Sequence, residues 1–255
     1  DLDRLMQGDL ADVGFVDPPY NLPIRGHVTG KGQVQHREFL QGSGEMTDDA
    51  FAGFLADGLV NAARVSRDGA VWFACMDWRH MDAMLGAGRQ AIGEMLNLCI
   101  WAKTNGGMGS LYRSQHQLVF VFRKGRHHRN NVQLGRYGRN RTNLWTYPGV
   151  NTFREGRMDE LRAHPTAKPV AMIRDALLDV SARGEIVLDP FLGGGATLMA
   201  AETSGRVAYG MELASLDGDV ALRRWCAAAG ADPLRQTDGV SLRDLESRTV
   251  AEVLS

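Results

Sequence analysis

The residues best suited to chemistry stand early in the chain, in the tetrapeptide Asp17-Pro18-Pro19-Tyr20 that follows the apolar run 13–16. The Asp17 carboxylate and the Pro18 carbonyl are two hydrogen-bond acceptors, and the two prolines stiffen the turn and remove two backbone donors. The Tyr20 ring offers a flat face on which a planar heterocycle can stack. Two acceptors beside a stacking ring suit the exocyclic amine of a nucleobase. The alternative is a proline turn that ends a strand with a solvated aspartate.

A second candidate site is the glycine-rich turn of residues 189–197, Asp-Pro-Phe-Leu-Gly-Gly-Gly-Ala-Thr, which follows the apolar run 186–188. Another apolar run, 207–211, comes next and is followed by Glu212. This order is typical of a nucleotide-binding unit in which glycines allow close backbone approach and the later acid binds ribose hydroxyls. No Lys-Ser or Lys-Thr pair follows the glycines, and the turn does not begin Gly-x-Gly, so neither a triphosphate loop nor an NAD site is indicated. The alternative is a tight structural connection.

Hydrophobic periodicity predicts the elements that must position these motifs. Thr47 can cap a helix with one apolar face, and Pro169 suits the first turn of a second helix that ends near Gly184. Short apolar runs rich in branched or aromatic residues indicate buried strands. Strands separated by such helices predict an α/β fold with a doubly wound, mostly parallel sheet and helices on both faces. The predicted strands are residues 13–16, 70–75, 96–101, 118–122, 186–188 and 207–211.

The net charge of −1 conceals a strong segregation of charge along the 255 residues. Residues 95–154 contain no acidic residue and hold ten of the 29 Lys and Arg residues, so the remaining 19 face all 30 acidic residues. A basic surface of this kind attracts a polyanion, and nucleic acid is the natural candidate. The alternative is a solvated face whose counter-charges come from elsewhere in the fold.

The number of cysteines and the length of the apolar runs indicate in which cellular compartment the protein is expected. Cys75, Cys99 and Cys226 are an odd number and far apart, so neither a disulfide framework nor a zinc site is indicated, and a reducing, cytoplasmic setting is expected. No apolar run approaches the ~18 residues that a membrane span needs, and no leader stands at the start. The chain opens at Asp1 without an initiator Met, which leaves room for a further domain outside this sequence.

Four motifs taken together resemble a known family. They are DPPY at 17–20, HPTAKP at 164–169, LDPFLGGGAT at 188–197 and GMEL at 210–213. In this order they are similar to the DNA amino-methyltransferases that make N6-methyladenine or N4-methylcytosine with S-adenosylmethionine, in the beta arrangement of that family. The resemblance runs from about Asp9 to Trp225. Residues 101–109 and 143–145 resemble bacterial and phage members, some of which join a ParB-like domain to the methylase.

The resemblance implies one Rossmann-like methyltransferase domain over residues 1–255, with a mobile loop at 21–46, a basic DNA-contacting region at 103–163 and a cofactor-binding half at 164–229. It implies S-adenosylmethionine as cofactor and double-stranded DNA as partner, with no metal and no membrane, in the cytoplasm of a bacterial or phage-infected cell. A homodimer and a fused or partner domain are left open.

The resemblance also implies a role for individual residues. The Asp17 carboxylate and the Pro18 carbonyl would accept the amine hydrogens of a flipped-out base while Tyr20 stacks on it. Phe191 would pack near the adenine of the cofactor, and Glu212 would bind its ribose. The implied cofactor-binding residues are Asp189, Phe191, Gly193, Gly195, Thr197, Glu212, Thr166 and Lys168, the implied catalytic residues are Asp17, Pro18, Pro19 and Tyr20, and the implied DNA-binding residues are Lys103, Arg113, Arg129, Arg136, Arg139 and Arg141.

The chain departs from the family pattern at two places. Residues 193–197 read Gly-Gly-Gly-Ala-Thr where a Gly-Ser-Gly-Thr-Thr run is common, so hydroxyls that could cap the next helix or touch the cofactor are missing. Ala214-Ser215 replaces the familiar Asp-Pro after Glu212, although Glu212 itself remains.

Within the family, Asp at the first position of the tetrapeptide favours adenine, whereas Ser favours cytosine. N4-cytosine methylation is the nearest alternative, and methylation of RNA or of a protein side-chain amide is another. A DNA-binding module without catalysis is the non-enzymatic alternative. The presence of Asp17, Tyr20, Phe191 and Glu212 together argues against it.

Overall fold

A seven-stranded sheet organises the chain in the computed structural model, which describes residues 1–23, 38–107, 111–149 and 168–253. The strand order is β5-β3-β4-β2-β1-β6-β7. Only β4 runs against the others, because it pairs antiparallel with both β2 and β3 whereas the remaining pairs are parallel. The strands are β1 (Ala11–Val16), β2 (Ser66–Met76), β3 (Gly93–Ala102), β4 (His116–Lys124), β5 (Leu144–Thr146), β6 (Ile186–Asp189) and β7 (Val207–Gly210).

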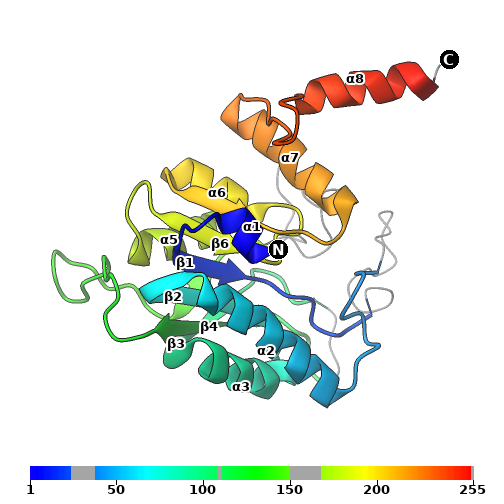
Figure 1. Cartoon of the computed structure of the whole chain (residues 1–255). Coiled ribbons are helices and arrows are strands. Elements are labelled where there is room, and N and C mark those ends of the chain that lie inside the picture. The colour runs from blue at the N-terminus through cyan, green and yellow to red at the C-terminus, as the bar shows by residue number, and fades with distance from the viewer. Residues whose placement is uncertain (24–37, 108–110, 150–167, 254–255) are drawn as a thin grey trace.

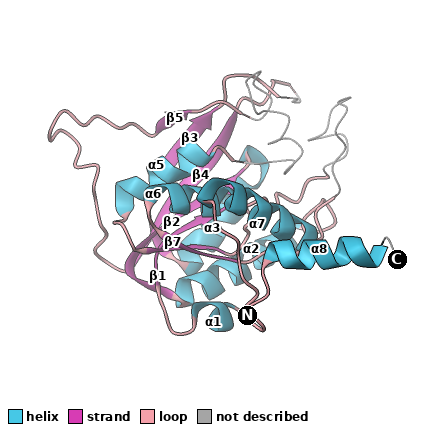
Figure 2. Cartoon of the chain, turned by 90° about the horizontal axis from the view of Figure 1, so that it is seen from above, coloured by secondary structure: helices cyan, strands magenta, loops and turns pink. Residues whose placement is uncertain are grey.

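Helices cover both faces of this sheet (Figure 1). One face carries α1 (Leu2–Met6), α2 (Asp48–Arg64) and α3 (Met81–Ala91), the last preceded by the 3-10 turn Trp78–His80. The other face carries α5 (Val170–Val180) and α6 (Ala196–Ser204). The chain ends in α7 (Ser215–Ala229) and α8 (Leu242–Val253), and α8 projects away from the body in both views (Figures 1 and 2).

The alternation of side chains along the strands builds two cores. On β2, Trp72, Ala74 and Met76 join the core under α2 and α3, whereas the intervening residues join the core under α5 and α6. Such two-sided burial explains why the central strands are almost continuously apolar. None of the described helices is long and apolar enough to cross a membrane.

The expected α/β fold with helices on both faces is confirmed, and each of the six predicted strands is present with longer or shifted ends. Thr47 caps α2, since its hydroxyl accepts a hydrogen bond from the amide of Ala50 at 3.3 Å. The strand β5 was not among the predicted strands. The antiparallel hairpin of β3 and β4 also departs from the strand–helix–strand pattern, because no helix separates these two strands.

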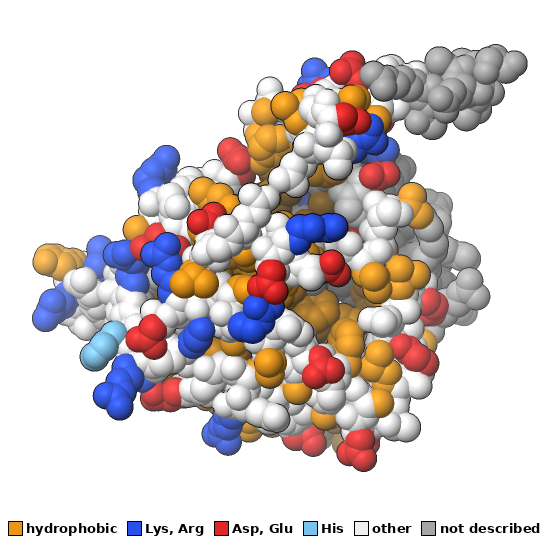
Figure 3. All heavy atoms as spheres, viewed as in Figure 1, with side chains coloured by type: hydrophobic (Ala, Val, Ile, Leu, Met, Phe, Trp, Pro, Cys, Tyr) orange, Lys and Arg blue, Asp and Glu red, His pale blue; other side chains and the backbone are white. Residues whose placement is uncertain are grey.

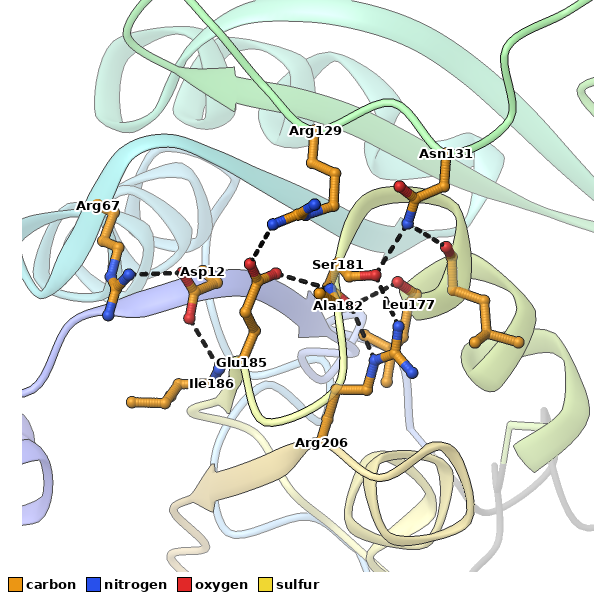
Figure 4. A network of polar contacts seen from close by, with 11 residues as sticks. Asp12, Arg67, Arg129, Asn131, Leu177, Ser181, Ala182, Glu185, Ile186 and Arg206 are labelled. Atoms are coloured by element: carbon orange, nitrogen blue, oxygen red, sulfur yellow. Dashed lines mark hydrogen bonds and ion pairs between the residues drawn. The ribbon is translucent and has the colours of Figure 1, made fainter.

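A polar network ties the loops together at the edge where the parallel strands begin (Figure 4). Arg206, which precedes β7, is buried and donates to the carbonyl of Ser181 at 2.6 Å, to its hydroxyl at 3.1 Å and to the carbonyl of Ser204 at 2.6 Å. Nearby, the Asp12 carboxylate accepts from the amide of Ile186 at 2.8 Å, and Glu185 accepts from the amide of Ala182 at 2.8 Å. These contacts join the C-terminal ends of α5 and α6 to the starts of the strands.

We expect Arg206→Met to lower the free energy of unfolding by roughly 2–4 kcal/mol, because it removes the donor to the buried Ser204 carbonyl and two hydrogen bonds to Ser181. Urea unfolding followed by circular dichroism measures the change. The matched control is Arg183→Met, since Arg183 is exposed on the same edge. Equal midpoints for the two variants would contradict the structural role of Arg206.

Candidate active site

A large cavity opens at the opposite edge, where β1, β6 and β7 end. Its volume is about 1400 Å³. In open α/β sheets, ligands bind outside the carboxyl ends of the strands, so this edge is where a site is expected. The predicted site residues that line it are Asp17, Pro18, Pro19, Tyr20, Lys168, Asp189, Phe191, Gly193, Thr197 and Glu212.

Both oxygens of the Asp17 carboxylate are engaged in hydrogen bonds. The Tyr20 hydroxyl donates to Oδ1 at 2.8 Å, and the Lys168 ammonium donates to Oδ2 and forms an ion pair with it. The side chain of Lys168 is only 3% exposed, and that of Asp17 is 20% exposed. Burial and the adjacent Asp17 charge raise the pKa of Tyr20 well above its usual range, so the phenol keeps its proton and can donate. The two donors thus hold the Asp17 carboxylate in a fixed orientation at the wall of the cavity.

A second lysine lies beside this pair. The ammonium nitrogens of Lys103 and Lys168 lie 4.8 Å and 6.0 Å from the centroid of the Trp101 ring, and that of Lys168 lies 5.4 Å from the Tyr20 ring. Burial, helped by repulsion from Lys168, lowers the pKa of Lys103 to about 8. The Trp101 ring and the two ammonium groups therefore lie beside Asp17 and Tyr20.

Asn21 was not predicted as a functional residue, yet it holds the loop that follows the tetrapeptide. It is buried and has a φ of 51°, in the left-handed region that Asn adopts more readily than most residues. Its side-chain oxygen accepts from the amides of Gly44 at 3.1 Å and Met46 at 3.2 Å, and its amide nitrogen donates to the Met46 carbonyl at 2.9 Å. Asn21 thereby closes the predicted loop 21–46, of which residues 24–37 lie outside the described residues.

The glycine-rich turn after β6 is shaped by Asp189 and by close packing. The Asp189 carboxylate accepts from the amide of Phe191 at 3.0 Å and from the Thr197 side chain. Gly195 has a φ of 78° at the start of α6, and a Cβ there would lie 2.8 Å from Cβ of Ala221. Glycine is required at this position both for its dihedral and for the approach of α7.

Glu212 reaches back over this turn from the end of β7. One oxygen accepts from the amide of Gly193 at 2.7 Å and the other from the amide of Ala214 at 2.8 Å. Each carboxylate oxygen has a second acceptor position, so Glu212 keeps capacity for hydroxyl donors. Phe191 packs edge-to-face on Phe54 of α2, with ring centroids 5.8 Å apart. A planar wall, a glycine turn without side chains and a carboxylate in one cavity fit a ligand that carries a nucleoside.

The six predicted DNA-binding residues fall into two groups. Lys103 and Arg113 lie in the connection from β3 to β4 at the cavity edge, where the Arg113 guanidinium donates to the carbonyls of Gly106 at 2.6 Å and Gly107 at 3.1 Å. Arg129, Arg136, Arg139 and Arg141 follow β4, whose C-terminal end lies at the other edge.

Arg129 and Arg141 are both held in ion pairs. Arg129 pairs with Glu185 at 2.6 Å, and Arg141 pairs with Asp179 at 2.5 Å. The structure therefore does not bring these arginines to the cavity. Thr166, also predicted to bind cofactor, lies outside the described residues.

Asp189 makes stability depend on pH. Burial raises its pKa to about 7 from an ordinary 3.8, so between these values the folded protein holds a proton that the unfolded chain has lost. The free energy of unfolding contributed by this group therefore falls as pH rises from about 4 to 7 and is flat above that window.

We expect Asp189→Asn to gain stability relative to the parent as pH rises through this window, by an amount on the order of a few kcal/mol at pH 8. Thermal unfolding at pH 5 and pH 8 measures it. Asp57→Asn, at an exposed position of α2, should show no such pH-dependent gain. Parallel curves for Asp189→Asn and its parent would contradict the assigned proton.

Solved structures of DNA methyltransferases share this fold at low sequence identity. The PvuII DNA methyltransferase, described as cytosine-N4-specific, superposes with a TM-score of 0.63 at 11% identity, covering 82% of this chain and 79% of that chain. The putative DNA modification methylase TTHA0409 of Thermus thermophilus, solved with S-adenosyl-L-methionine, gives a TM-score of 0.59 at 19% identity over 94% of both chains.

Curated relatives include methylases of Escherichia coli K12. The putative methylase YubD is 26% identical over 206 residues, 81% of this chain and 78% of the relative. The DNA adenine methyltransferase YhdJ is 42% identical over 82 residues, which are 32% of this chain and only 26% of that relative. The family model for N6/N4-type DNA methylases matches residues 11–215. The chain belongs to this DNA methylase family.

Proposed function

We propose that this DNA methyltransferase transfers a methyl group from S-adenosylmethionine to the exocyclic N6 amine of an adenine flipped out of double-stranded DNA. The observation that carries the proposal is the convergence of the Asp17 tetrapeptide and the Glu212 carboxylate on one cavity. A nucleobase amine and a nucleoside-bearing cofactor would then meet at the same strand edge.

The residues present fit S-adenosylmethionine as the methyl donor. Glu212 would accept hydrogen bonds from ribose hydroxyls, Phe191 would pack against the adenine ring, and the turn at Gly193 and Gly195 would admit the amino acid portion. Asp189 shapes this turn through its bond to the Phe191 amide. When bound, the cofactor supplies a methyl group on a sulfonium sulfur, which leaves as the thioether.

The reaction requires a carboxylate that accepts hydrogen bonds from the target amine. The amine lone pair is delocalised into the ring, and acceptance of its hydrogens by Asp17 and by the Pro18 carbonyl favours a pyramidal nitrogen. Positioning and electrostatics then supply most of the acceleration, and the amine proton is lost to Asp17 or to water as the new bond forms. Tyr20 would exchange its bond to Asp17 for a stack on the base.

We infer that Lys168 is a positioning residue for Asp17. Its ammonium is nearly fully buried and bonded to Oδ2, so it can hold the carboxylate while Oδ1 receives the amine. This differs from the position beside the cofactor carboxylate that the family resemblance implies for Lys168.

Adenine is favoured over cytosine by Asp at the first position of the tetrapeptide and by the local similarity to a relative named as a DNA adenine methyltransferase. The base would leave the duplex at a cost of a few kcal/mol. Among the predicted DNA-binding residues, Lys103 and Arg113 are placed to meet DNA at the cavity edge. Phosphate contacts of this kind position the duplex without reading its sequence.

We expect labelled S-adenosylmethionine and unmethylated duplex DNA to yield N6-methyladenine, and Asp17→Ala to lower the rate by about 10² to 10³-fold through loss of a charged acceptor. Digestion to nucleosides followed by mass analysis measures both. Asp57→Ala, exposed on α2, is the matched control and should retain activity. N4-methylcytosine as the product would overturn the adenine assignment and keep the mechanism. A variant as active as the parent would remove Asp17 from the reaction.

We expect Glu212→Gln to weaken binding of S-adenosylmethionine by about tenfold or more, because a hydrogen bond to a charged group contributes about 1.5–3 kcal/mol. Isothermal calorimetry without DNA measures it. Asp219→Asn, on the exposed face of α7, should leave the affinity unchanged.

Lys168→Met tests the positioning role. It should lower the methylation rate measured by nucleoside analysis, while the cofactor Kd from calorimetry stays within about twofold of the parent.

A further inference from the structure

A basic loop leaves the end of β4 and protrudes from the edge opposite the cavity. This basic loop, residues 125–141, contains five arginines, two histidines and no acidic residue. It extends beyond the sheet on the left of Figure 1 and again in the turned view (Figures 1 and 2). Arg126, Arg136 and Arg139 have no acidic partner among the described residues, whereas Arg129 and Arg141 are paired. The loop therefore presents at least three uncompensated positive charges to solvent.

The basic loop is held in a defined shape. At its start, the His127 carbonyl lies so close to Gly69 that a Cβ there would be 1.9 Å from it. In its middle, the Asn131 side chain donates to the carbonyls of Leu178 at 2.8 Å and Ser181 at 2.9 Å. At its tip, the amide of Gly135 bonds to the Arg139 carbonyl and that of Arg139 to the Arg136 carbonyl, each at 3.0 Å. The arginines are thus presented on a closed turn.

The surroundings of the loop are also basic. Arg67, Arg183 and Arg206 lie along the same edge, and the charges of Arg129 and Arg183 help to lower the pKa of Arg206 after burial. Two acids there are paired, Asp12 with Arg67 and Glu185 with Arg129, whereas Asp68 is exposed beside Gly125 at the start of the loop. Figure 3 shows Lys and Arg side chains gathered at this end of the molecule. The edge as a whole attracts an anion with many charges.

The length of the sheet separates this edge from the reaction site. The strand β2 runs from Ser66 at the basic edge to Met76 at the cavity edge, and its 11 residues span about 35 Å at ~3.3 Å per residue. That distance equals about ten base pairs of duplex at ~3.4 Å per pair, so the loop lies well beyond the pairs that flank a base flipped out at the cavity. The basic loop therefore cannot serve the contacts expected of the residues that flank the flipped base.

We propose that the basic loop is a second DNA-binding surface, which holds the phosphate backbone of a duplex segment outside the one being methylated. The occupant follows from the family, because a DNA methylase works on a long polyanion, and from a loop that carries five arginines and no acidic residue. The contacts are independent of sequence, since arginines on a loop outside any groove meet phosphates. The proposal rests on family membership and not on the choice of adenine.

The test compares two triple variants that remove equal charge. Arg126→Gln, Arg136→Gln and Arg139→Gln are combined in one protein, and Arg174→Gln, Arg235→Gln and Arg243→Gln in the control, because these arginines are exposed elsewhere. Binding of a long duplex of about 100 base pairs is measured across salt concentrations without cofactor. Each lost phosphate contact makes the slope of log K against log salt shallower by about 0.9, so the loop variant should lose up to about 2.7 relative to the control.

Turnover on a short duplex separates the two surfaces. A target duplex of about ten base pairs, ~34 Å long, fills the cavity edge alone, so kcat and KM there should match the control, while KM on the long duplex rises. A third protein with lysine at the three positions should keep the parental slope. Equal slopes for the loop and control variants overturn the proposal, as does an equal loss on the short duplex. If the loop variant loses affinity for single-stranded RNA in the same salt series but keeps its affinity for the DNA duplex, the proposal is also overturned. Failure of adenine methylation leaves the binding result intact.

Discussion

The parallel pairing of β1 with β6 is the constraint on which the site depends. Val13 lies opposite Val187 and Gly14 opposite Leu188, so Asp189 ends its strand near the point where β1 leads into Asp17. The strand β1 can lie between β2 and β6 only because residue 14 is glycine, since a Cβ there would be 2.1 Å from the Trp72 ring. This register brings two motifs that are more than 170 residues apart to one edge. The charges of Asp17 and Glu212 consequently add to burial in raising the pKa of Asp189.

Much of the fold could be predicted because its signals are local. The caps and apolar faces of α2 and α5 are visible within a dozen residues, and so are the buried strands. The strand β5 could not be predicted in the same way, because it has three residues and only Trp145 is buried. The direction of β4 is also not a local property. Its hydrogen bonds to β2 and β3 decide it, and no periodicity within 116–124 distinguishes a parallel from an antiparallel strand.

The antiparallel direction of β4 changes how the acid-free segment 95–154 is interpreted. The absence of acids over residues 95–154 predicted one basic DNA-contacting region, but β4 carries the chain from the cavity edge to the far edge within that region. Lys103 and Arg113 therefore stand at one end of the sheet and Arg129, Arg136 and Arg139 at the other. Composition identifies how many cations a segment has, whereas topology decides which surface they share.

The contact of Lys168 with Asp17 could not be predicted from the sequence either, because 151 residues separate them. The turn at Asn21 could be predicted weakly, because an asparagine directly after a rigid tetrapeptide suits a residue with left-handed backbone dihedrals.

The contacts around Asp17 explain how this carboxylate can serve as a fixed acceptor. The Lys168 ammonium holds one oxygen, and the Tyr20 hydroxyl bonds the other in the position that an incoming amine would take. An incoming amine then replaces one donor by another, so little reorganisation accompanies its binding. Burial and repulsion from Lys168 lower the pKa of Lys103 to about 8, so this second ammonium gives up its proton more readily than an ordinary lysine and repels Lys168 less as pH rises.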